Sequence, residues 1–193
     1  MKVNEIFYSL QGEGHNTGTP AVFVRLSGCN LRCPFCDTAH EAHKDMSEEE
    51  IAREVSRHPA RLVVVTGGEP SLQLTASLVG LFHAAGKTVA VETNGTRPLP
   101  ENVDWVTLSP KDAFCPGSAS RVRLSRCDEL KVVFTGNAPQ IPEGVHADRL
   151  FLQPCDTGNA ERNAEFTRGA VAWCLAHPEW RLSLQTHKMC GFR

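Results

Sequence analysis

Three cysteines close together in the chain are the residues best suited to chemistry. Cys29, Cys33 and Cys36 lie within eight residues, directly after an apolar segment that is typical of a buried strand. A single loop can therefore turn all three thiols toward one centre. Structural zinc sites need four ligands, usually as two CxxC pairs, and the sequence has no second pair. A four-iron cluster held by three cysteines leaves one iron open, so the CxxxCxxC spacing favours a cluster that binds a substrate or cofactor directly.

Other uses of these thiols stay open on spacing alone. A zinc loop completed by His40 or His43, or a set of thiols without any ligand, would place the same cysteines in the same segment. A disulfide framework is not expected, because nothing in the sequence indicates an extracellular protein. The remaining cysteines are scattered and are expected to be packing residues. They are Cys115, Cys127, Cys155, Cys174 and Cys190.

A turn rich in glycine follows the next apolar segment. Thr66-Gly67-Gly68-Glu69-Pro70 comes directly after residues 62–65, and two adjacent glycines let a backbone approach a ligand closely. Glu69 is also a residue type that stabilises a helix N-terminus, so the turn alone is weak evidence of function. The segment Glu92-Thr93-Asn94-Gly95 ends a third apolar run, and it is either a functional element or an ordinary Asn-Gly turn.

Apolar, β-branched segments recur along the chain and predict six or seven strands. They cover residues 21–26, 62–66, 88–92, 104–108, 130–134, 150–153 and 181–185. Three helices are predicted, at about 47–56 with Ser47 and Glu50 as a capping box, at 72–85 and at 159–176. Strands that alternate with helices imply a mainly parallel α/β sheet. We therefore expect an incomplete β/α barrel with its chemistry at the carboxyl ends of the strands.

Length and charge narrow the class of protein. The chain has 193 residues, which fits a single domain spanning residues 1–193. Its net charge of −2 lacks the basic character of a nucleic-acid-binding protein. No segment approaches the roughly 18 consecutive apolar residues of a membrane span, and the N-terminal residues have no signal-peptide pattern. We therefore expect a cytoplasmic protein that has neither a nucleic acid nor a membrane as its partner.

Taken together, the cysteine loop and the glycine turn resemble the shared core of the radical S-adenosylmethionine (SAM) superfamily. Its members carry CxxxCxxC after the first barrel strand and a segment similar to Gly67-Gly68-Glu69-Pro70 after the second. The resemblance implies an incomplete (β/α)6 barrel with about three outer helices. It also implies a [4Fe–4S] cluster bound by Cys29, Cys33 and Cys36, with SAM chelating the open iron through its methionine part.

Further motifs narrow the resemblance to one family. Leu10-Gln11-Gly12-Glu13-Gly14, Ser109-Pro110-Lys111 and Gln185-Thr186-His187-Lys188 look like those of the 7-carboxy-7-deazaguanine synthases, which make the deazapurine core on the route to queuosine. The likeness implies 6-carboxy-5,6,7,8-tetrahydropterin as the substrate. In a Mg²⁺-dependent radical reaction, its pyrazine ring would contract to a pyrrole with loss of ammonia.

The resemblance also assigns residues to each ligand. Substrate contacts fall on Leu10, Gln11, Gly12, Arg25, Thr66, His187 and Lys188. SAM contacts fall on Phe35, Asp37, Gly68, Ser109, Lys111, Gln153 and Asp156, although Cys155-Asp156 is not characteristic of the family. Thr38 would give a hydroxyl ligand to Mg²⁺, a hard ion that prefers oxygen. Arg25 suits a carboxylate because a guanidinium binds it through two N–H groups, but a structural ion pair would also satisfy an arginine in an apolar strand.

Catalytic groups and partners are implied less specifically. No general acid or base is identified, and the candidates are Glu13, His15 and His187. A flavodoxin or ferredoxin as electron donor, and a homodimer, follow from family likeness. Two alternatives remain: an activating enzyme of the same superfamily that installs a glycyl radical on a protein, and a non-catalytic zinc-binding module.

Overall fold

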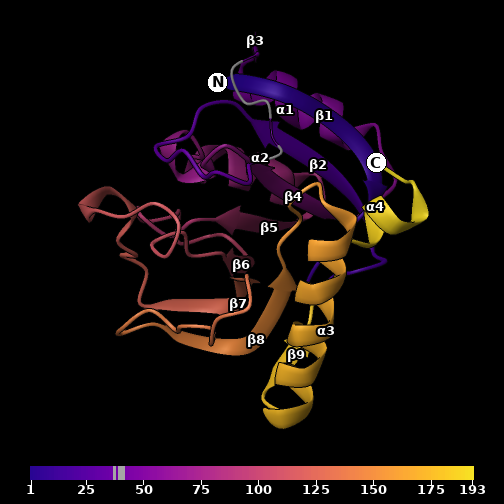
Figure 1. Cartoon of the computed structure of the whole chain (residues 1–193). Coiled ribbons are helices and arrows are strands. Elements are labelled where there is room, and N and C mark those ends of the chain that lie inside the picture. Colours follow the sequence, from indigo (N-terminus) through magenta and orange to yellow (C-terminus); the bar gives the residue numbers. More distant parts are fainter. Residues whose placement is uncertain (37, 39–41) are drawn as a thin grey trace.

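One curved sheet forms the centre of the molecule (Figure 1). The computed structural model describes residues 1–36, 38 and 42–193. The strands are β1 (Lys2–Leu10), β2 (Pro20–Leu26), β3 (Lys44–Asp45), β4 (Leu62–Gly67), β5 (Thr88–Thr93), β6 (Trp105–Leu108), β7 (Arg126–Phe134), β8 (His146–Pro154) and β9 (Trp180–Leu182). Their order in the sheet is β3-β1-β2-β4-β5-β6-β7-β8-β9. Strand β1 is antiparallel to both of its neighbours, and every pairing from β2 to β9 is parallel.

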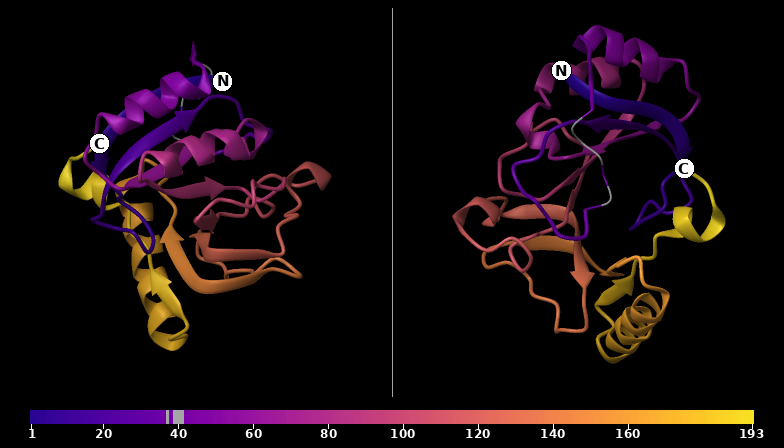
Figure 2. Two further views of the ribbon diagram at one scale, coloured as in Figure 1. Left: turned by 180° about the vertical axis from the view of Figure 1, so that it is seen from behind. Right: turned by 45° about the horizontal axis from the view of Figure 1, so that its top comes forward.

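Helices cover the outer face of the sheet. Helices α1 (Glu48–Ser56) and α2 (Ala76–Ala84) pack beside each other, and α3 (Ala160–Ala176) lies against β8 and β9 (Figure 2). The short helix α4 (Thr186–Cys190) lies near the C-terminus, and 3-10 turns occupy Pro70–Leu72 and Ser118–Ser120. The predicted capping box of α1 is present, since Ser47 Oγ accepts from the Glu50 N–H while Glu50 accepts from the Ser47 N–H.

The alternation of side chains along the parallel strands separates the outer core from the barrel interior. On β2, Val22, Val24 and Leu26 are buried in the outer core with residues of α1 and α2. The intervening Ala21 and Phe23 belong to a smaller apolar cluster with Val64. A strand presents alternate residues to opposite faces, so this second cluster fills the barrel interior.

Polar side chains replace apolar ones on the interior face as the strands approach their carboxyl ends. Arg25 follows Ala21 and Phe23 in the same alternation, and Thr66 follows Val64. Glu92 follows Ala90 on β5 in the same way. The register of β2 and β4 pairs Arg25 with Thr66, so these two interior positions lie side by side at the same level of the barrel. The barrel interior is therefore apolar toward the amino ends of these strands and polar at their carboxyl ends, where a pocket opens.

The predicted fold class is confirmed: the sheet is a mostly parallel, incomplete barrel with few outer helices. Within the described residues its edge strands are β3 and β9, which do not pair with each other. The predicted absence of helices between β5 and β6 is also confirmed. The long 109–125 connection between β6 and β7 contains only the 3-10 turn.

Several predicted boundaries were wrong. Strand β1 was not predicted, because its polar and apolar residues mix along an antiparallel strand that is only partly buried. The helix expected at 72–85 begins at Ala76, since Thr75 caps it and residues 70–72 form a 3-10 turn. The strand expected at 181–185 ends at Leu182, and α4 then follows from Thr186. Among the described residues, no helix combines the length and apolar character needed to cross a bilayer.

Candidate active site

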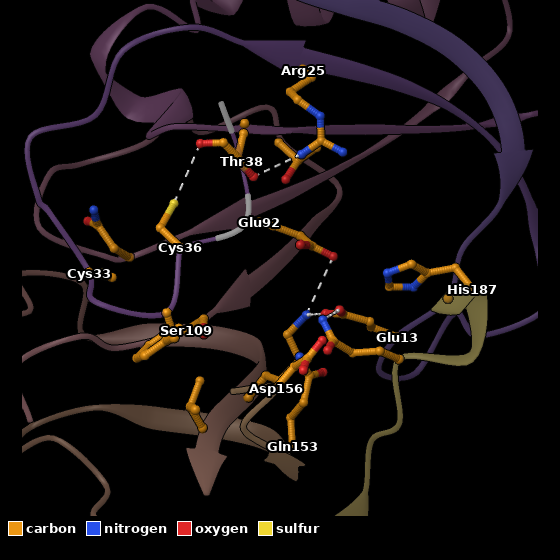
Figure 3. A pocket seen from close by; sticks show the side chains of 18 of the residues that line it. Glu13, Arg25, Cys33, Cys36, Thr38, Glu92, Ser109, Gln153, Asp156 and His187 are labelled. Carbon is orange, nitrogen blue, oxygen red and sulfur yellow. Dashed lines mark hydrogen bonds and ion pairs between the residues drawn. The ribbon is translucent and has the colours of Figure 1, made fainter. Parts of the chain in front are cut away.

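A pocket with a cavity volume of about 300 Å³ opens at the carboxyl ends of the parallel strands (Figure 3). Every residue that the sequence assigned to a ligand lines this pocket, except Asp37, which lies outside the described residues. In Figure 3, Cys33 and Cys36 lie on one side of the pocket, and Glu13 and His187 lie on the other. The structure thus brings together segments from both ends of the chain.

The three cysteines of the loop fit a cluster better than a single ion. Cys29, Cys33 and Cys36 all line the pocket, yet no three His, Cys, Asp or Glu side chains among residues 1–36, 38 and 42–193 are grouped tightly enough to hold one metal ion. Thiolates on one tetrahedral ion must approach each other to about 4 Å, given metal–sulfur bonds of about 2.3 Å. Ligands of a cubane bind separate irons and stand farther apart. Three thiols spaced around one cavity therefore suit the cubane, whereas His40 of the zinc alternative lies outside the described residues.

A fourth thiol, which the sequence did not reveal, contacts this loop. Cys115 Sγ lies 3.7 Å from Cys33 Sγ, although 82 positions separate the residues. Burial, followed by this contact with Cys115, raises the pKa of the Cys33 thiol to about 12, and burial raises that of Cys29. Metal binding would therefore have to displace protons from both thiols. The prediction that Cys115 is only a packing residue did not anticipate this position.

The glycine turn after β4 is packed against the cysteine loop. A Cβ at Gly67 would lie 2.1 Å from the Leu26 carbonyl oxygen, and one at Gly68 would lie 2.0 Å from the Gly28 carbonyl oxygen. Backbone hydrogen bonds join the same segments, from the Gly68 N–H to Leu26 (3.0 Å) and from the Glu69 N–H to Gly28 (2.9 Å). The two glycines are thus required by the close approach of two backbone segments, besides any approach of a ligand.

Glu69 joins the ends of β4 and β5. Its side chain is completely buried and accepts hydrogen bonds from Thr93 Oγ1 (2.6 Å), the Asn94 N–H (2.8 Å) and the Ser71 N–H (3.0 Å). Asn94 in turn donates through Nδ2 to Asn30 Oδ1 in the cysteine loop, at 3.1 Å. The Glu92–Gly95 segment is therefore more than an isolated Asn-Gly turn, because it fixes the cysteine loop against the second and third parallel strands.

Arg25 and Thr38 meet at the rim of the pocket. Arg25 Nε donates to Glu5 Oε1 at 2.8 Å, and Arg25 Nη1 lies 3.4 Å from Thr38 Oγ1. The structural ion pair considered from the sequence is therefore present. It orients the guanidinium of Arg25, which still lines the cavity. A cation and a hydroxyl oxygen are thus placed side by side, the two groups expected to bind the substrate carboxylate and Mg²⁺ respectively.

The C-terminal segment holds the loop between β1 and β2. The Thr186 N–H and Oγ1 both donate to the Gly12 carbonyl, at 3.0 and 2.9 Å. A Cβ at Gly12 would lie 2.3 Å from His187 Nδ1, so glycine is needed for this contact. Gln185 Nε2 donates to Glu13 Oε1 at 2.9 Å. Residues 10–13 therefore form one wall of the pocket together with Gln185, His187 and Lys188.

A cluster of buried charges lies on the inner face of β5 and β7, and most of it was missed from the sequence. Lys131 is 4% exposed and pairs with Glu13 and with Glu92, whose Oε1 lies 3.6 Å from Lys131 Nζ. Burial alone would raise the pKa of Glu13, but the Lys131 ammonium lowers it to about 2. Burial raises the pKa of Glu129, which accepts from the His15 N–H at 2.9 Å. A lysine within the apolar run at 130–134 was the available signal, because a buried ammonium requires anionic partners.

Several of the residues expected to bind SAM make polar contacts within the protein. Lys111 Nζ donates to the carbonyl and Oγ of Ser109, at 2.7 and 2.6 Å, and burial lowers the Lys111 pKa. Gln153 Oε1 accepts from Ser183 Oγ at 2.9 Å. Asp156 pairs with Lys188 at 2.8 Å, and the hydrogen bond from Lys188 lowers the pKa of this carboxyl. Asp156 and Lys188, expected at different ligands, are therefore neighbours.

Two of the three candidate acid–base residues line the pocket. Glu13 and His187 are part of the cavity wall. The His15 ring instead stacks on Trp105, with ring centroids 4.9 Å apart, and burial lowers the His15 pKa. The geometry therefore favours Glu13 and His187 over His15 for contact with a ligand.

Comparison with known proteins defines the class first. Residues 23–112 match the family model described as the radical SAM superfamily, a range that includes the cysteine loop, the glycine turn and Lys111. The chain is a radical SAM enzyme, and this class implies a [4Fe–4S] cluster and SAM as cofactors.

Relatives over the full length define the family within that class. The chain is 53% identical over 192 residues to 7-carboxy-7-deazaguanine synthase of Bacteroides thetaiotaomicron, covering 100% of this chain and 98% of the relative. It is 42% identical over 218 residues to the enzyme of the same name from Nitratidesulfovibrio vulgaris, covering 98% of each. The crystal structure of QueE from Escherichia coli superposes with a TM-score of 0.70 at 29% identity, covering 95% of this chain and 92% of that one. The chain belongs to the 7-carboxy-7-deazaguanine synthase family, which decides against both alternatives left open by the sequence.

Proposed function

We propose that this enzyme converts 6-carboxy-5,6,7,8-tetrahydropterin to 7-carboxy-7-deazaguanine, with Mg²⁺ and with release of ammonia. The observation that carries the proposal is the full-length 53% identity to a relative named for that product. The conversion is balanced without an external oxidant, since the product and one ammonia contain all the atoms of the substrate. SAM would then be regenerated when hydrogen returns to it.

The chemistry of the pocket supports a flat, polar, anionic ligand of this kind. The substrate carries a carboxylate, and Arg25 presents a guanidinium to the cavity. The ring presents amide-like donors and acceptors, which Gln11 and the backbone of residues 10–12 can complement. We assign substrate contacts to these residues and to Thr66, His187 and Lys188.

The opposite side of the pocket suits the two cofactors. We assign the cluster to Cys29, Cys33 and Cys36, and SAM to Phe35, Gly68, Ser109, Lys111, Gln153 and Asp156. When bound, the reduced cluster and SAM supply a carbon-centred radical that can abstract hydrogen from the substrate. The chain's own contribution is to hold the ligands in place, to fix the rotation of the substrate through its carboxylate, and to exclude water from the barrel interior.

Product mass tests the proposed function. Anaerobically reconstituted enzyme is supplied with the carboxytetrahydropterin, a strong reductant, SAM and Mg²⁺. The expected product is lighter than the substrate by one ammonia molecule, and free ammonia appears in equal amount. Consumption of SAM without any change in the pterin would refute the proposed substrate.

Mg²⁺ is assigned to Thr38 and to oxygens of the substrate. A single hydroxyl binds Mg²⁺ weakly, and the ion usually retains waters and uses substrate oxygens. Thr38→Ala should therefore increase the Mg²⁺ concentration needed for half-maximal rate while leaving iron content unchanged. Thr88→Ala is the matched control, because Thr88 is exposed and lies at the amino end of β5, away from the pocket. Identical Mg²⁺ titrations for the Thr38 variant and wild type would remove Thr38 from the metal site.

We also propose a low-potential donor of the flavodoxin or ferredoxin class, and a homodimeric assembly. The radical reaction needs one electron from outside the chain to start it. Reduction of the cluster by each purified donor, followed by its absorbance, tests the first proposal. Light scattering of the reconstituted enzyme tests the second.

A further inference from the structure

Lys131 has an unusual environment for a lysine of this chain. It lies on the interior face of β7, between Glu129 and Val133 in the alternation of the strand, and it lines the pocket. Its side chain is 5% exposed, and its partners are the carboxylates of Glu13 and Glu92. An ammonium with so little access to water is stabilised only if such partners remain ionised.

Each carboxylate paired with Lys131 also bonds to a segment expected to bind the substrate. Glu13 Oε1 accepts from Gln185 Nε2 at 2.9 Å, beside His187. Glu92 Oε1 accepts from Gln11 Nε2 at 3.0 Å. Lys131 therefore connects three parts of the pocket wall that are distant in sequence: the loop after β1, the end of β5 and the segment before α4.

Lys87 shows what a purely structural lysine looks like in the same fold. Its Nζ donates to two backbone carbonyls, those of His58 and Ala60, both at 2.7 Å. That arrangement ties two loops and involves no group of the pocket. The partners of Lys131 are instead two ionisable side chains that themselves line the cavity.

We propose that Lys131 is a positioning residue that pairs with Glu13 and Glu92 and holds their carboxylates turned into the pocket, where they accept N–H groups of the substrate ring. The inference rests on the proposed function for the identity of that ring. Only an ionised carboxylate accepts hydrogen bonds on both oxygens without donating one. Among the described residues, the contacts of Glu92 with Gln11 and Lys131 both use Oε1, so Oε2 is the atom that we assign to the ligand.

Removal of the ammonium leaves Glu13 without the cation that is paired with it. The charged groups around Glu13 and Glu92 are Lys131 and Glu129 from β7, Lys111 from the loop after β6, and His187 from α4. Burial raises the pKa of Glu13 once the Lys131 ammonium no longer opposes it, and buried carboxyl groups have pKa values as high as about 8–9. Glu13 would then be protonated at neutral pH and would donate where an acceptor is required.

The kinetic test uses the reconstituted holoenzyme with Lys131→Met, which keeps the length and removes the charge. We expect the KM for the carboxytetrahydropterin to rise about 10- to 100-fold, the loss expected for a hydrogen bond to a charged group. The ratio of kcat/KM between variant and wild type should increase as the pH is raised from about 6 to 9, because Glu13 ionises again. Lys131→Arg should recover part of the loss, since it restores the charge. Lys87→Met is the control, expected to lose stability without any change in KM.

A spectroscopic measurement tests the inference without requiring catalytic turnover. Lys131→Met should show the infrared C=O stretch of a protonated carboxyl in addition to any band that wild type shows. This additional band should disappear as the pH is raised from about 6 to 9. The double variant Lys131→Met/Glu13→Gln should lack the additional band, because Glu13 is the carboxyl that burial protonates once the ammonium is removed. A wild-type enzyme that leaves the pterin unchanged refutes the proposed function, and the infrared arm still tests Lys131. A pH-independent rate loss together with no additional carboxyl band would overturn the positioning role.

Discussion

Gly68→Ala is the perturbation whose effect follows most directly from the structure. The added Cβ would lie 2.0 Å from the Gly28 carbonyl oxygen and 2.4 Å from the Gly28 carbonyl carbon. Contacts of real Cβ atoms essentially never fall below 3.0 Å, so the turn or the cysteine loop must move by about 1 Å. Neither neighbour is a flexible side chain. The displacement is therefore transmitted to Cys29, the next residue of the loop.

The expected cost combines two effects. Overpacking in a tight site costs about 1–3 kcal/mol, and weakening the two backbone hydrogen bonds of this turn adds about 0.5–1.5 kcal/mol each. A total of roughly 2–6 kcal/mol corresponds to a decrease in Tm of roughly 4–24 °C for a chain of this size. Displacement of Cys29 should also reduce the iron and sulfide retained per chain after reconstitution.

Thermal unfolding followed by circular dichroism, and iron analysis of the same samples, are the assays. Gly80→Ala is the matched control, because Gly80 lies within α2, and beyond the nearby backbone of that helix no described heavy atom lies within 4 Å of the added Cβ. Alanine should stabilise that helix by up to about 1 kcal/mol. Should Gly68→Ala unfold at the wild-type temperature and retain full iron, the packing of the glycine turn on the cysteine loop would not matter as described.

Three further predictions concern the loop, its support and the buried charges. Cys33→Ala should lose cluster iron and all turnover while Cys174→Ala, on α3, keeps both; full iron in the Cys33 variant would contradict its role as a ligand. Glu69→Gln places an amide donor against the donors that now bind the carboxylate, and it should lower the free energy of unfolding by roughly 2–4 kcal/mol in a urea titration; a change near zero would show that the donors find other partners. The pKa of Glu13 is lowered to about 2, so its ionised form stabilises the fold above about pH 4.5 and that stabilisation is lost as the pH falls toward 2. The difference in unfolding free energy between wild type and Glu13→Gln should therefore shrink over that range, and a constant difference would refute the paired state of Glu13.

Much of the parallel barrel could be predicted from local sequence. Apolar, β-branched runs such as 62–66 and 88–92 are buried on both faces, so their strands are recognisable without knowledge of their neighbours. Strand β1 was missed for the opposite reason, since most of its residues are only partly buried and its pattern is mixed. Helix α4 is five residues long and lacks a side-chain cap, so it carries no local signal.

The spacing of the three loop cysteines and the motifs around them determined, without coordinates, the class of cofactor and the candidate residues. Short-range spacing is sufficient there, because one loop carries all three thiols. The contacts that complete the site join distant segments: Cys115 meets Cys33, and Lys131 meets Glu13 across 118 positions. Only the curvature of the sheet decides which interior side chains face one another. The buried charges that line the pocket are therefore a property of the tertiary structure, whereas the cysteine loop is a property of the sequence.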